Sequence, residues 1–479
     1  MNADTLQDIK KRYLQLHPVN ASSGGSYSYR GGLPLIKFDI SASQMPLFLD
    51  GSQLRISGRV TVREGAAGAT NLTNTQNNYI DGFTGINQFI DIVTVSSKRL
   101  NTVLERVNNY SRLAPSLVSA MNDENDLEFG LAHGDLNHQT IPLTRQGLNV
   151  YNEFNSNQLI PAANRRGQDF SAQLYTGIFQ SGQLIDLSTQ SGVGGLVIEL
   201  LLKSDSNVVF GSDANTNNAT YTLSDLVLTV PVYEMHGASA MAQQSKVNEF
   251  SFNSWQSMFQ TVNSSTSVVA FTPGLSRVTS VVTNYITASD LGNQNFNNCR
   301  LGNIGELQAV RWSRNGALYP LNFRSETVEQ QNNNTAKTNQ ADNASNHIYS
   351  NRAEPFRYAL EGVTTERDAL NQKCMNAWQS WGAGAVDRAQ NAGRDGVAPG
   401  SANSLSVLYD AYGSGVNFQN TVWSCELNTS STSQLRINDV PTVVANNLDG
   451  TATTAQAITM YFLSKNTIMM SPQGIDLQR

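Results

Sequence analysis

Charged side chains are scarce in this 479-residue chain. Lys, Arg, Asp and Glu together make up 15% of it, against roughly 25% in an average soluble protein. The net charge is −6, so the chain lacks the basic surplus with which proteins bind nucleic acid phosphates. We therefore expect no direct sequence-specific binding of nucleic acid. We also expect a surface made largely of Asn, Gln, Ser and Thr, which suits tightly packed assemblies.

Cysteines and long apolar runs are scarce too. Cys299, Cys374 and Cys425 are widely spaced and odd in number, which argues against a disulfide framework and fits small core residues in a reducing compartment. No stretch approaches the ~20 apolar residues of a membrane-spanning helix. Met1 to Leu16 carries charges where a signal peptide has its apolar segment. We expect a protein that is made inside the cell and stays soluble.

The common motifs of catalytic and metal sites are missing. No Gly-Lys-Ser/Thr follows a glycine run, and no Gly-x-Ser-x-Gly occurs. His133 and His138 flank Asp135 at a spacing that matches no familiar zinc pattern. The acidic run at 123–126 departs from the calcium-loop template. We expect no enzymatic activity, no catalytic residue, no cofactor and no metal ion.

The sequence contains instead many short strand patterns separated by turns rich in Gly, Ser and Asn. The clearest lies within Leu33–Arg63, where Leu54, Ile56 and Val60 alternate with Arg55 and polar residues. Such alternation predicts a strand with one apolar and one basic face. Further strands are predicted at Phe89–Val95, Phe170–Phe179, Leu184–Leu187, Gly195–Leu202 and Tyr221–Tyr233. Closely spaced strands of this kind are typical of a sandwich or barrel.

The second half of the sequence repeats this character. Leu307–Arg314 and Ala317–Pro320 flank Asn315-Gly316, the favoured pair for a two-residue hairpin turn. Ala457–Ser464 alternates as a last strand. Helical spacing predicts short helices at Leu100–Tyr110 and from about Glu366 to Trp381. The polar run Thr327–Ser350 cannot form a core and is expected to be a long exposed loop.

The N-terminus has the spacing of a short amphipathic helix over Thr5–Leu16. Its apolar stripe consists of Leu6, Ile9, Tyr13 and Leu16. The flexible run Ala21–Ser26 follows, and a helix this short is unstable unless a partner covers its apolar side. Two interpretations stay open. Either this segment is an assembly arm that docks on a neighbour, another protein or a lipid surface, or it packs on its own domain.

Composition divides the chain into five segments. The small polar run His236–Lys246 separates the two strand-rich halves and reads as a linker. The expected segments are an N-terminal arm with a short amphipathic helix at 1–29, a first strand-rich unit at 30–236, a linker at 237–247, a second unit at 248–472 and a C-terminal tail at 473–479.

The order of these patterns resembles the double jelly-roll major capsid proteins. That lineage includes adenovirus, tailless membrane-containing phages, virophages, polinton-like viruses and large DNA viruses of eukaryotes. The resemblance rests on Phe89–Val95, on Gly177-Ile-Phe179 before Leu184–Leu187, on Tyr221–Tyr233 and on Val310–Gly316. It spans about residues 30–472 and implies an all-β fold. That fold would be two consecutive eight-stranded jelly-roll β-sandwiches with short helices inserted in loops.

The resemblance also implies a function. The chain would be a major capsid protein whose homotrimers form pseudo-hexagonal capsomers that tile the icosahedral shell of a DNA virus. It would be made and assembled inside the host cell and reside in the virion. Its partners would be neighbouring capsomers and minor capsid or penton proteins. The N-terminal arm would face inward, where an internal membrane is a further candidate partner.

Two other classes share parts of this sequence pattern. A carbohydrate-binding β-sandwich adhesin or fibre protein would have the same low charge and the same Asn- and Thr-rich surface. A β-rich polysaccharide-degrading enzyme would need paired carboxylates on facing strands, whereas the acidic residues here fall mostly in predicted loops and helices. The oligomeric state separates the adhesin from the capsomer, because a robust trimer favours the capsomer.

Overall fold

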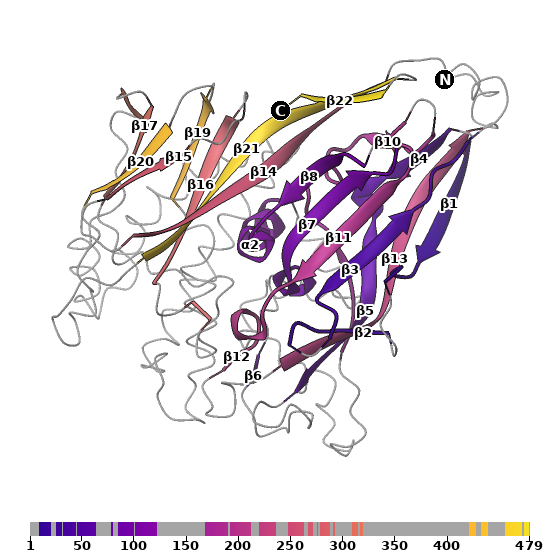
Figure 1. Ribbon diagram of the computed structural model, residues 1–479, viewed down its shortest axis with the longest axis horizontal. Helices are drawn as coiled ribbons and strands as arrows, with labels where there is room; N and C mark the ends of the chain where they lie inside the picture. Colours follow the sequence, from indigo (N-terminus) through magenta and orange to yellow (C-terminus); the bar gives the residue numbers. More distant parts are fainter. Residues whose placement is uncertain are drawn as a thin grey trace, which may run out of the picture.

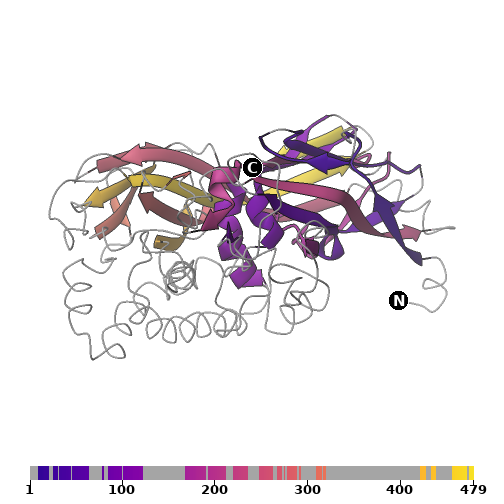
Figure 2. The same ribbon diagram turned by 90° about the horizontal axis from the view of Figure 1, so that it is seen from below.

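In the part of the chain that it describes, the computed structural model consists mostly of antiparallel β-sheets. Figure 1 shows two groups of sheets, and the view from below in Figure 2 shows that the groups lie side by side. The structure describes residues 9–20, 25–30, 32–44, 46–63, 78–79, 85–99, 101–121, 168–189, 192–211, 220–235, 248–262, 267–271, 275, 278–287, 291–292, 309–314, 317–319, 421–427, 433–438, 456–471 and 474–478.

The first group pairs a seven-stranded sheet with a four-stranded sheet. The larger has the order β10-β4-β13-β5-β9, with β1 and β2 also paired to β13, and the smaller has the order β3-β11-β7-β8. The strands of the larger sheet are β1 (Ile9–Leu16), β2 (Ser26–Tyr27), β4 (Leu47–Asp50), β5 (Arg55–Arg63), β9 (Gln168–Gln173), β10 (Leu184–Asp186) and β13 (Thr220–Met235). Those of the smaller sheet are β3 (Leu35–Ile40), β7 (Ile90–Ser97), β8 (Val103–Val107) and β11 (Leu196–Leu202).

The second group pairs a five-stranded sheet with another four-stranded sheet. The larger has the order β14-β21-β16-β19, with β22 also paired to β21, and the smaller has the order β15-β20-β17-β18. The larger contains β14 (Asn248–Val262), β16 (Val278–Thr287), β19 (Thr421–Leu427), β21 (Gln456–Ser471) and β22 (Gly474–Gln478). The smaller contains β15 (Ser267–Phe271), β17 (Ala309–Arg314), β18 (Ala317–Tyr319) and β20 (Ser433–Asn438).

Helices are few in the described part of the chain. They are α2 (Tyr110–Met121) and the 3-10 turns η1 (Gly51–Gln53), η2 (Gly85–Phe89) and η4 (Asp205–Asn207). A further two-stranded sheet joins β6 (Asn78–Tyr79) to β12 (Phe210–Gly211). Among these helices none is long and apolar enough to cross a membrane.

The strands form where apolar side chains recur at every second position. In β3 and β11 buried and half-buried side chains alternate without a break. The predicted apolar face of β5 is confirmed, because Leu54, just before the strand, and Ile56 and Val60 within it are at most 2% exposed. Alternation with a period of two places one set of side chains between the sheets and the other outside.

The arginines predicted on the opposite face of β5 pair with the neighbouring strand β9. The Arg55 Nε donates to Ser171 Oγ at 3.0 Å. The Arg59 Nε lies 2.6 Å from Asp169 Oδ1, and the resulting ion pair raises the pKa of Arg59. Arg55 and Arg59 are thus paired within the subunit.

Each group contains a 16-residue strand that pairs with several other strands along its two edges. β13 pairs with β1 and β2 along one edge and with β5 and β4 along the other. β21 pairs with β14 along one edge and with β16 and β22 along the other. In both groups the first strand pairs antiparallel with a long strand that comes late in the sequence of that group. These pairs are β1 with β13 and β14 with β21. The two halves therefore share this pairing without repeating a sequence.

The predicted N-terminal helix is wrong for residues 9–16, which form strand β1. β1 pairs with β13 over eight residues, from Ile9 opposite Met235 to Leu16 opposite Leu228. Leu14 and Leu16 pack against the core. Helical spacing was a poor guide because the partner strand lies more than 200 residues away, where no local pattern reports it.

The predicted tail is wrong as well, because residues 474–478 form β22. This strand pairs with β21, and its Ile475 and Leu477 pack against the core. The end of the second unit therefore extends beyond residue 472. A strand paired in this way buries apolar side chains that a free tail would leave in water.

Two further elements begin or end at other positions than predicted. Residues 103–107 are strand β8, and the helix begins only at Tyr110. The strand predicted over Phe170–Phe179 ends at Gln173, after which the chain turns, with Gln180 N donating to Thr176 O at 3.0 Å.

The hairpin around residues 315–316 is confirmed by its strands, since Arg314 lies opposite Ala317 in the β17–β18 pair. The predicted last strand at Ala457–Ser464 is also confirmed and continues to Ser471. Other predictions lie outside the described residues. These are the linker, the loop Thr327–Ser350, the helix near Glu366–Trp381, the acidic run at 123–126, the His133–His138 cluster, Cys299 and Cys374.

Substitution of Ile198 tests the assigned sheet faces. Ile198 is fully buried in β11, between β3 and β7. Ile198→Ala should lower the free energy of unfolding by about 2–5 kcal/mol, because it leaves a cavity between the sheets. Val197→Ala, one residue earlier on the outer face, should cost clearly less. Urea or thermal unfolding measures both, and equal losses would contradict the assignment.

Candidate functional site: a buried junction and two outer faces

The two groups of sheets meet at a ribbon formed by β14 and β21. From Thr459 to Ser464 every side chain of β21 is at most 1% exposed, so both faces of the strand are covered. Tyr461 and Leu463 belong to the same continuous core as the first group, together with Trp255 of β14. A strand buried on both faces reads as an almost continuous apolar run, as this one does.

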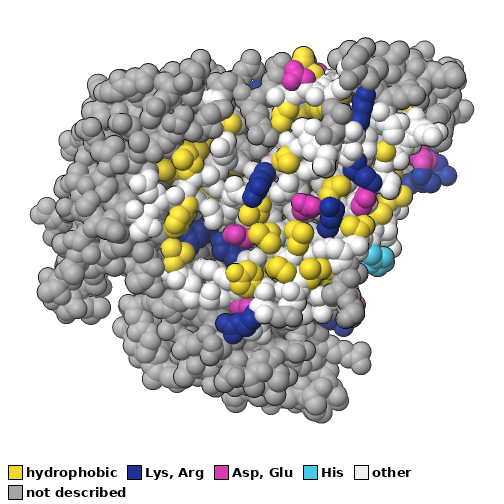
Figure 3. Space-filling model, in the orientation of Figure 1, with side chains coloured by type: hydrophobic (Ala, Val, Ile, Leu, Met, Phe, Trp, Pro, Cys, Tyr) yellow, Lys and Arg dark blue, Asp and Glu magenta, His cyan; other side chains and the backbone are white. Residues whose placement is uncertain are grey.

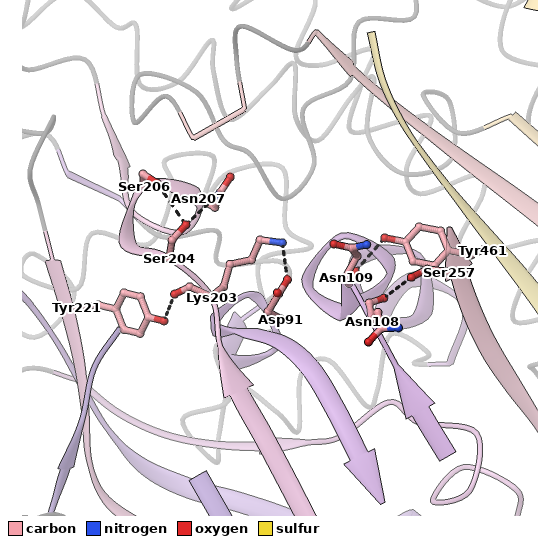
Figure 4. Close-up of polar contacts among 10 residues, drawn as sticks. All are labelled: Asp91, Asn108, Asn109, Lys203, Ser204, Ser206, Asn207, Tyr221, Ser257 and Tyr461. Atoms are coloured by element: carbon pink, nitrogen blue, oxygen red, sulfur yellow. Dashed lines mark hydrogen bonds and ion pairs between the residues drawn. The ribbon is translucent and has the colours of Figure 1, made fainter. Parts of the chain in front are cut away.

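Polar side chains on the ribbon bond to the backbone of the first group. Tyr461 OH donates to Asn109 O at 2.9 Å, and Ser257 Oγ donates to Asn108 O at 3.0 Å. Figure 4 shows both contacts where β8 leads into α2. Asn109 has a positive φ of 52°, a conformation that Asn tolerates better than most residues. Burial raises the pKa of Tyr461, so its hydroxyl keeps the proton that it donates.

Glu105 of β8 is the buried acid at this junction, at 2% exposure. Its Oε1 accepts from Gly177 N at 3.0 Å and from Ser254 Oγ at 2.9 Å, and its Oε2 accepts from Ile178 N at 2.9 Å. Burial raises the pKa of Glu105 to about 7, and the three hydrogen bonds oppose that rise. One carboxyl group thus joins β8, the turn after β9 and strand β14 of the second group.

Gly177 allows the turn to approach β14 closely. A Cβ at this position would lie 1.6 Å from Asn253 O, so any side chain would force the two groups apart. The run Gly177-Ile-Phe179, which carried part of the sequence resemblance, therefore supplies two backbone donors to Glu105 and the space that β14 requires.

A second set of polar contacts lies within the first group. Lys203 Nζ is 3.0 Å from Asp91 Oδ1, and the Tyr221 hydroxyl donates to Lys203 O. Figure 4 shows these residues and the neighbouring bond from Asn207 to Ser204. Tyr221 belongs to the seven-stranded sheet, whereas Lys203 directly follows β11 of the four-stranded sheet. The contacts hold together one end of the sandwich.

The outer face of the four-stranded sheet β3-β11-β7-β8 is the first candidate assembly surface. Its charges pair across strands, with Lys37 Nζ 3.0 Å from Glu199 Oε1 and Lys98 Nζ 2.6 Å from Asp39 Oδ1. Figure 3 shows hydrophobic side chains interspersed with basic and acidic side chains on this side of the molecule. One row across the sheet is entirely apolar and half-buried, and it consists of Leu35, Leu201 and Ile92.

The outer face of β1 is the second candidate assembly surface. Tyr13 is 61% exposed, and Lys11 Nζ lies 5.1 Å from its ring centre and 5.4 Å from that of Tyr233. Hydrogen bonds to the two tyrosines raise the pKa of Lys11, so it stays charged. Of the predicted apolar stripe, Tyr13 and the half-buried Ile9 share this face, Leu16 points toward the core, and Leu6 lies outside the described residues.

No pattern in the sequence singles out Glu105. On a helix over Leu100–Tyr110, Val103, Leu104, Val107 and Tyr110 fall on one stripe and Glu105 falls on the opposite side. As a strand, the same segment buries Leu104, Glu105 and Val107. Within the described part of the chain no group of three or more His, Cys, Asp or Glu side chains is placed to hold a metal ion.

Gly177→Ala tests the close approach at the junction. The added methyl group meets Asn253 O, so we expect a loss of about 1–3 kcal/mol in unfolding free energy and faster hydrogen exchange in β14. Gly182→Ala is the matched control, because its methyl group meets nothing within 4 Å and its cost is only the strain of φ 68°. If β14 exchanges alike in both variants, the junction is looser than described.

Comparison with known proteins places this fold. No family model and no curated protein sequence matches the chain. A chain of the PBCV-1 virus capsid aligns with a TM-score of 0.51 at 11% identity, covering 98% of this chain and 97% of that one. A chain of the Sputnik virophage structure aligns with a TM-score of 0.50 at 8% identity, covering 98% and 88%. These likenesses, with the sheet topology above, show that the chain has the double jelly-roll fold, all-β with two consecutive sandwiches.

Proposed function

We propose that this chain is the major capsid protein of a DNA virus and that its place is in the virion. One observation carries the proposal. Two jelly-roll sandwiches follow each other in one chain, are joined through a ribbon buried on both faces, and align over nearly their whole length with a chain of the PBCV-1 virus capsid. A rigid pair of sandwiches is a building block for a shell, since its strands resist bending and its loops gather at two ends.

The proposed assembly is a homotrimer. Three copies of a chain with two similar sandwiches present six similar walls, so a closed trimer approximates a hexagon and can tile an icosahedral shell. Neighbouring capsomers and minor capsid or penton proteins would then be the partners. The paired charges on the outer face of the four-stranded sheet support tight packing, because such a surface presents little net charge to a neighbour.

The segment boundaries belong to the same proposal in corrected form. We assign residues 9–235 to the first sandwich, because β1 and β2 are part of its seven-stranded sheet. The second sandwich spans residues 248–478, because it includes β22. Residues 237–247 remain the proposed linker.

The adhesin alternative and the polysaccharide-degrading enzyme have less support. The acids buried in the described part of the chain are Glu105, Asp186 and Asp205. Each accepts hydrogen bonds from backbone N–H groups of this chain, which is a poor position for chemistry on a sugar. The exposed Tyr13 of the β1 face is the feature that an adhesin would use.

The oligomeric state tests the proposed assembly. The purified full-length chain should form a stable particle of three times 52.2 kDa at micromolar concentration, measured by light scattering after size exclusion. Negative-stain images should show a compact, near-hexagonal outline. A stable monomer would contradict the capsomer and favour the adhesin.

The N-terminal segment stays in the proposal with a smaller role. We propose that Tyr13 and Ile9, on the outer face of β1, contact neighbouring capsomers, a minor protein or a membrane beneath the shell. Leu16 is assigned to the core, because it packs there.

Substitutions of two adjacent residues test this role. Tyr13→Ser should leave thermal stability unchanged, because the side chain is largely exposed. It should raise the concentration needed for particle assembly about tenfold or more if the ring anchors a contact. Leu14→Ala, on the core face, should instead lower the unfolding free energy by about 1 kcal/mol. Normal assembly of the Tyr13 variant would remove β1 from the contact surface.

A further inference from the structure

The carboxyl group of Glu105 lies where its own charge can affect the contact between the two sandwiches. The carboxyl group is withdrawn from water, and its hydrogen-bond donors come from the turn after β9 and from β14. Gly177 brings that turn against the backbone of β14. An ionised carboxylate gains from three donors but loses its hydration, whereas a neutral carboxyl group avoids most of that loss.

The other titratable groups at the junction do not share this behaviour. Tyr110 of α2 donates to Asn87 Oδ1 and accepts from Tyr175 N, and burial holds its pKa well above 10. Tyr461 of β21 also stays neutral, and the nearby Arg112 of α2 only partly opposes the rise of its pKa. Arg106, next to Glu105 on β8, is exposed and donates to Asn108. Glu105 is therefore the group of this set that can titrate between pH 5 and 8.

Glu105 can take up a proton without a rearrangement of the surrounding residues. Ser254 Oγ lies 2.9 Å from Oε1, and a hydroxyl group can either donate or accept. When Glu105 is neutral, its O–H donates to Ser254 Oγ, and the two backbone N–H groups keep their acceptors. The hydrogen bond reverses direction and no atom has to move far.

We infer that Glu105 is a proton-responsive contact between the two sandwiches, which tightens their junction in mildly acidic solution and loosens it as the pH rises to neutral and above. The inference goes beyond the proposed capsid function and concerns the fold of the single chain, so it stands or falls independently of trimer or particle formation.

The direction follows from proton linkage. The pKa of Glu105 is about 7 in the folded chain, above the ordinary 4.5, so between these values the folded state binds more protons than the unfolded state. The contribution of this group to stability is complete below pH 4.5 and is lost as the pH rises through about 7. This is the reverse of a carboxylate held by an ion pair.

The test measures hydrogen exchange in the full-length chain between pH 5 and 8, corrected for the intrinsic pH dependence of exchange. Peptides that cover residues 176–179 and 249–258 should lose protection about tenfold or more from pH 5 to pH 8. Peptides from β11, which lies away from the junction, are the internal control. Their protection against hydrogen exchange should not change. Equal protection of the junction peptides at both pH values overturns the inference.

Two variants separate titration from a purely structural role. Ser254→Ala removes a bond that lowers the pKa of Glu105, so the midpoint of the pH dependence should move to higher pH. Glu105→Gln cannot ionise, so its junction should show the same protection at pH 5 and pH 8. Glu199→Gln, on an outer face, is the matched control and should behave like the wild type. An unmoved midpoint in the Ser254 variant, or an undiminished pH dependence in Glu105→Gln, overturns the inference.

Discussion

The β14–β21 ribbon must be buried on both faces, and the arrangement of the two sandwiches depends on this constraint. On one face Tyr461 and Leu463 complete a core that continues into the first sandwich. The alternating residues Met460 and Phe462 are just as buried. A ribbon shared in this way leaves little room for one sandwich to rotate against the other, because rotation would expose apolar surface on both sides.

Burial on both faces makes every polar group at the junction costly unless it has a partner. The structure meets this cost mainly with neutral groups, such as the hydroxyls of Ser257 and Tyr461 on backbone carbonyls. Glu105 and the nearby Arg112 are charged exceptions, and Glu105 accepts hydrogen bonds from three donors. The low charge content of the chain fits the same constraint, since a chain with many packed surfaces has few places where a charge stays hydrated.

Local sequence patterns predicted the elements whose alternation of apolar and polar residues, or whose turn residues, lie within a few positions of each other. The alternation in β5, the hairpin between β17 and β18 and the last strand β21 are all found as predicted. Local patterns failed where pairing with a strand far away in the sequence decides the conformation. Residues 9–16 have apolar side chains at helical spacing, but β13 offers them eight residues of backbone pairing. In β8 the spacing of Val103, Leu104 and Val107 also suggested a helix, and the strand pairing with β7 prevailed.

The sequence by itself determined the class of the fold, its two strand-rich halves and the near absence of surplus charge, because these follow from periodicity and composition summed over many residues. Only the tertiary structure decided that β1 is a strand, that Gly177 meets the backbone of Asn253 and that Glu105 is buried between three elements. The physical reason is that each of these depends on contacts between segments about 70 to more than 200 residues apart. Such contacts are selected by the packing of the whole chain and leave no mark on the local pattern.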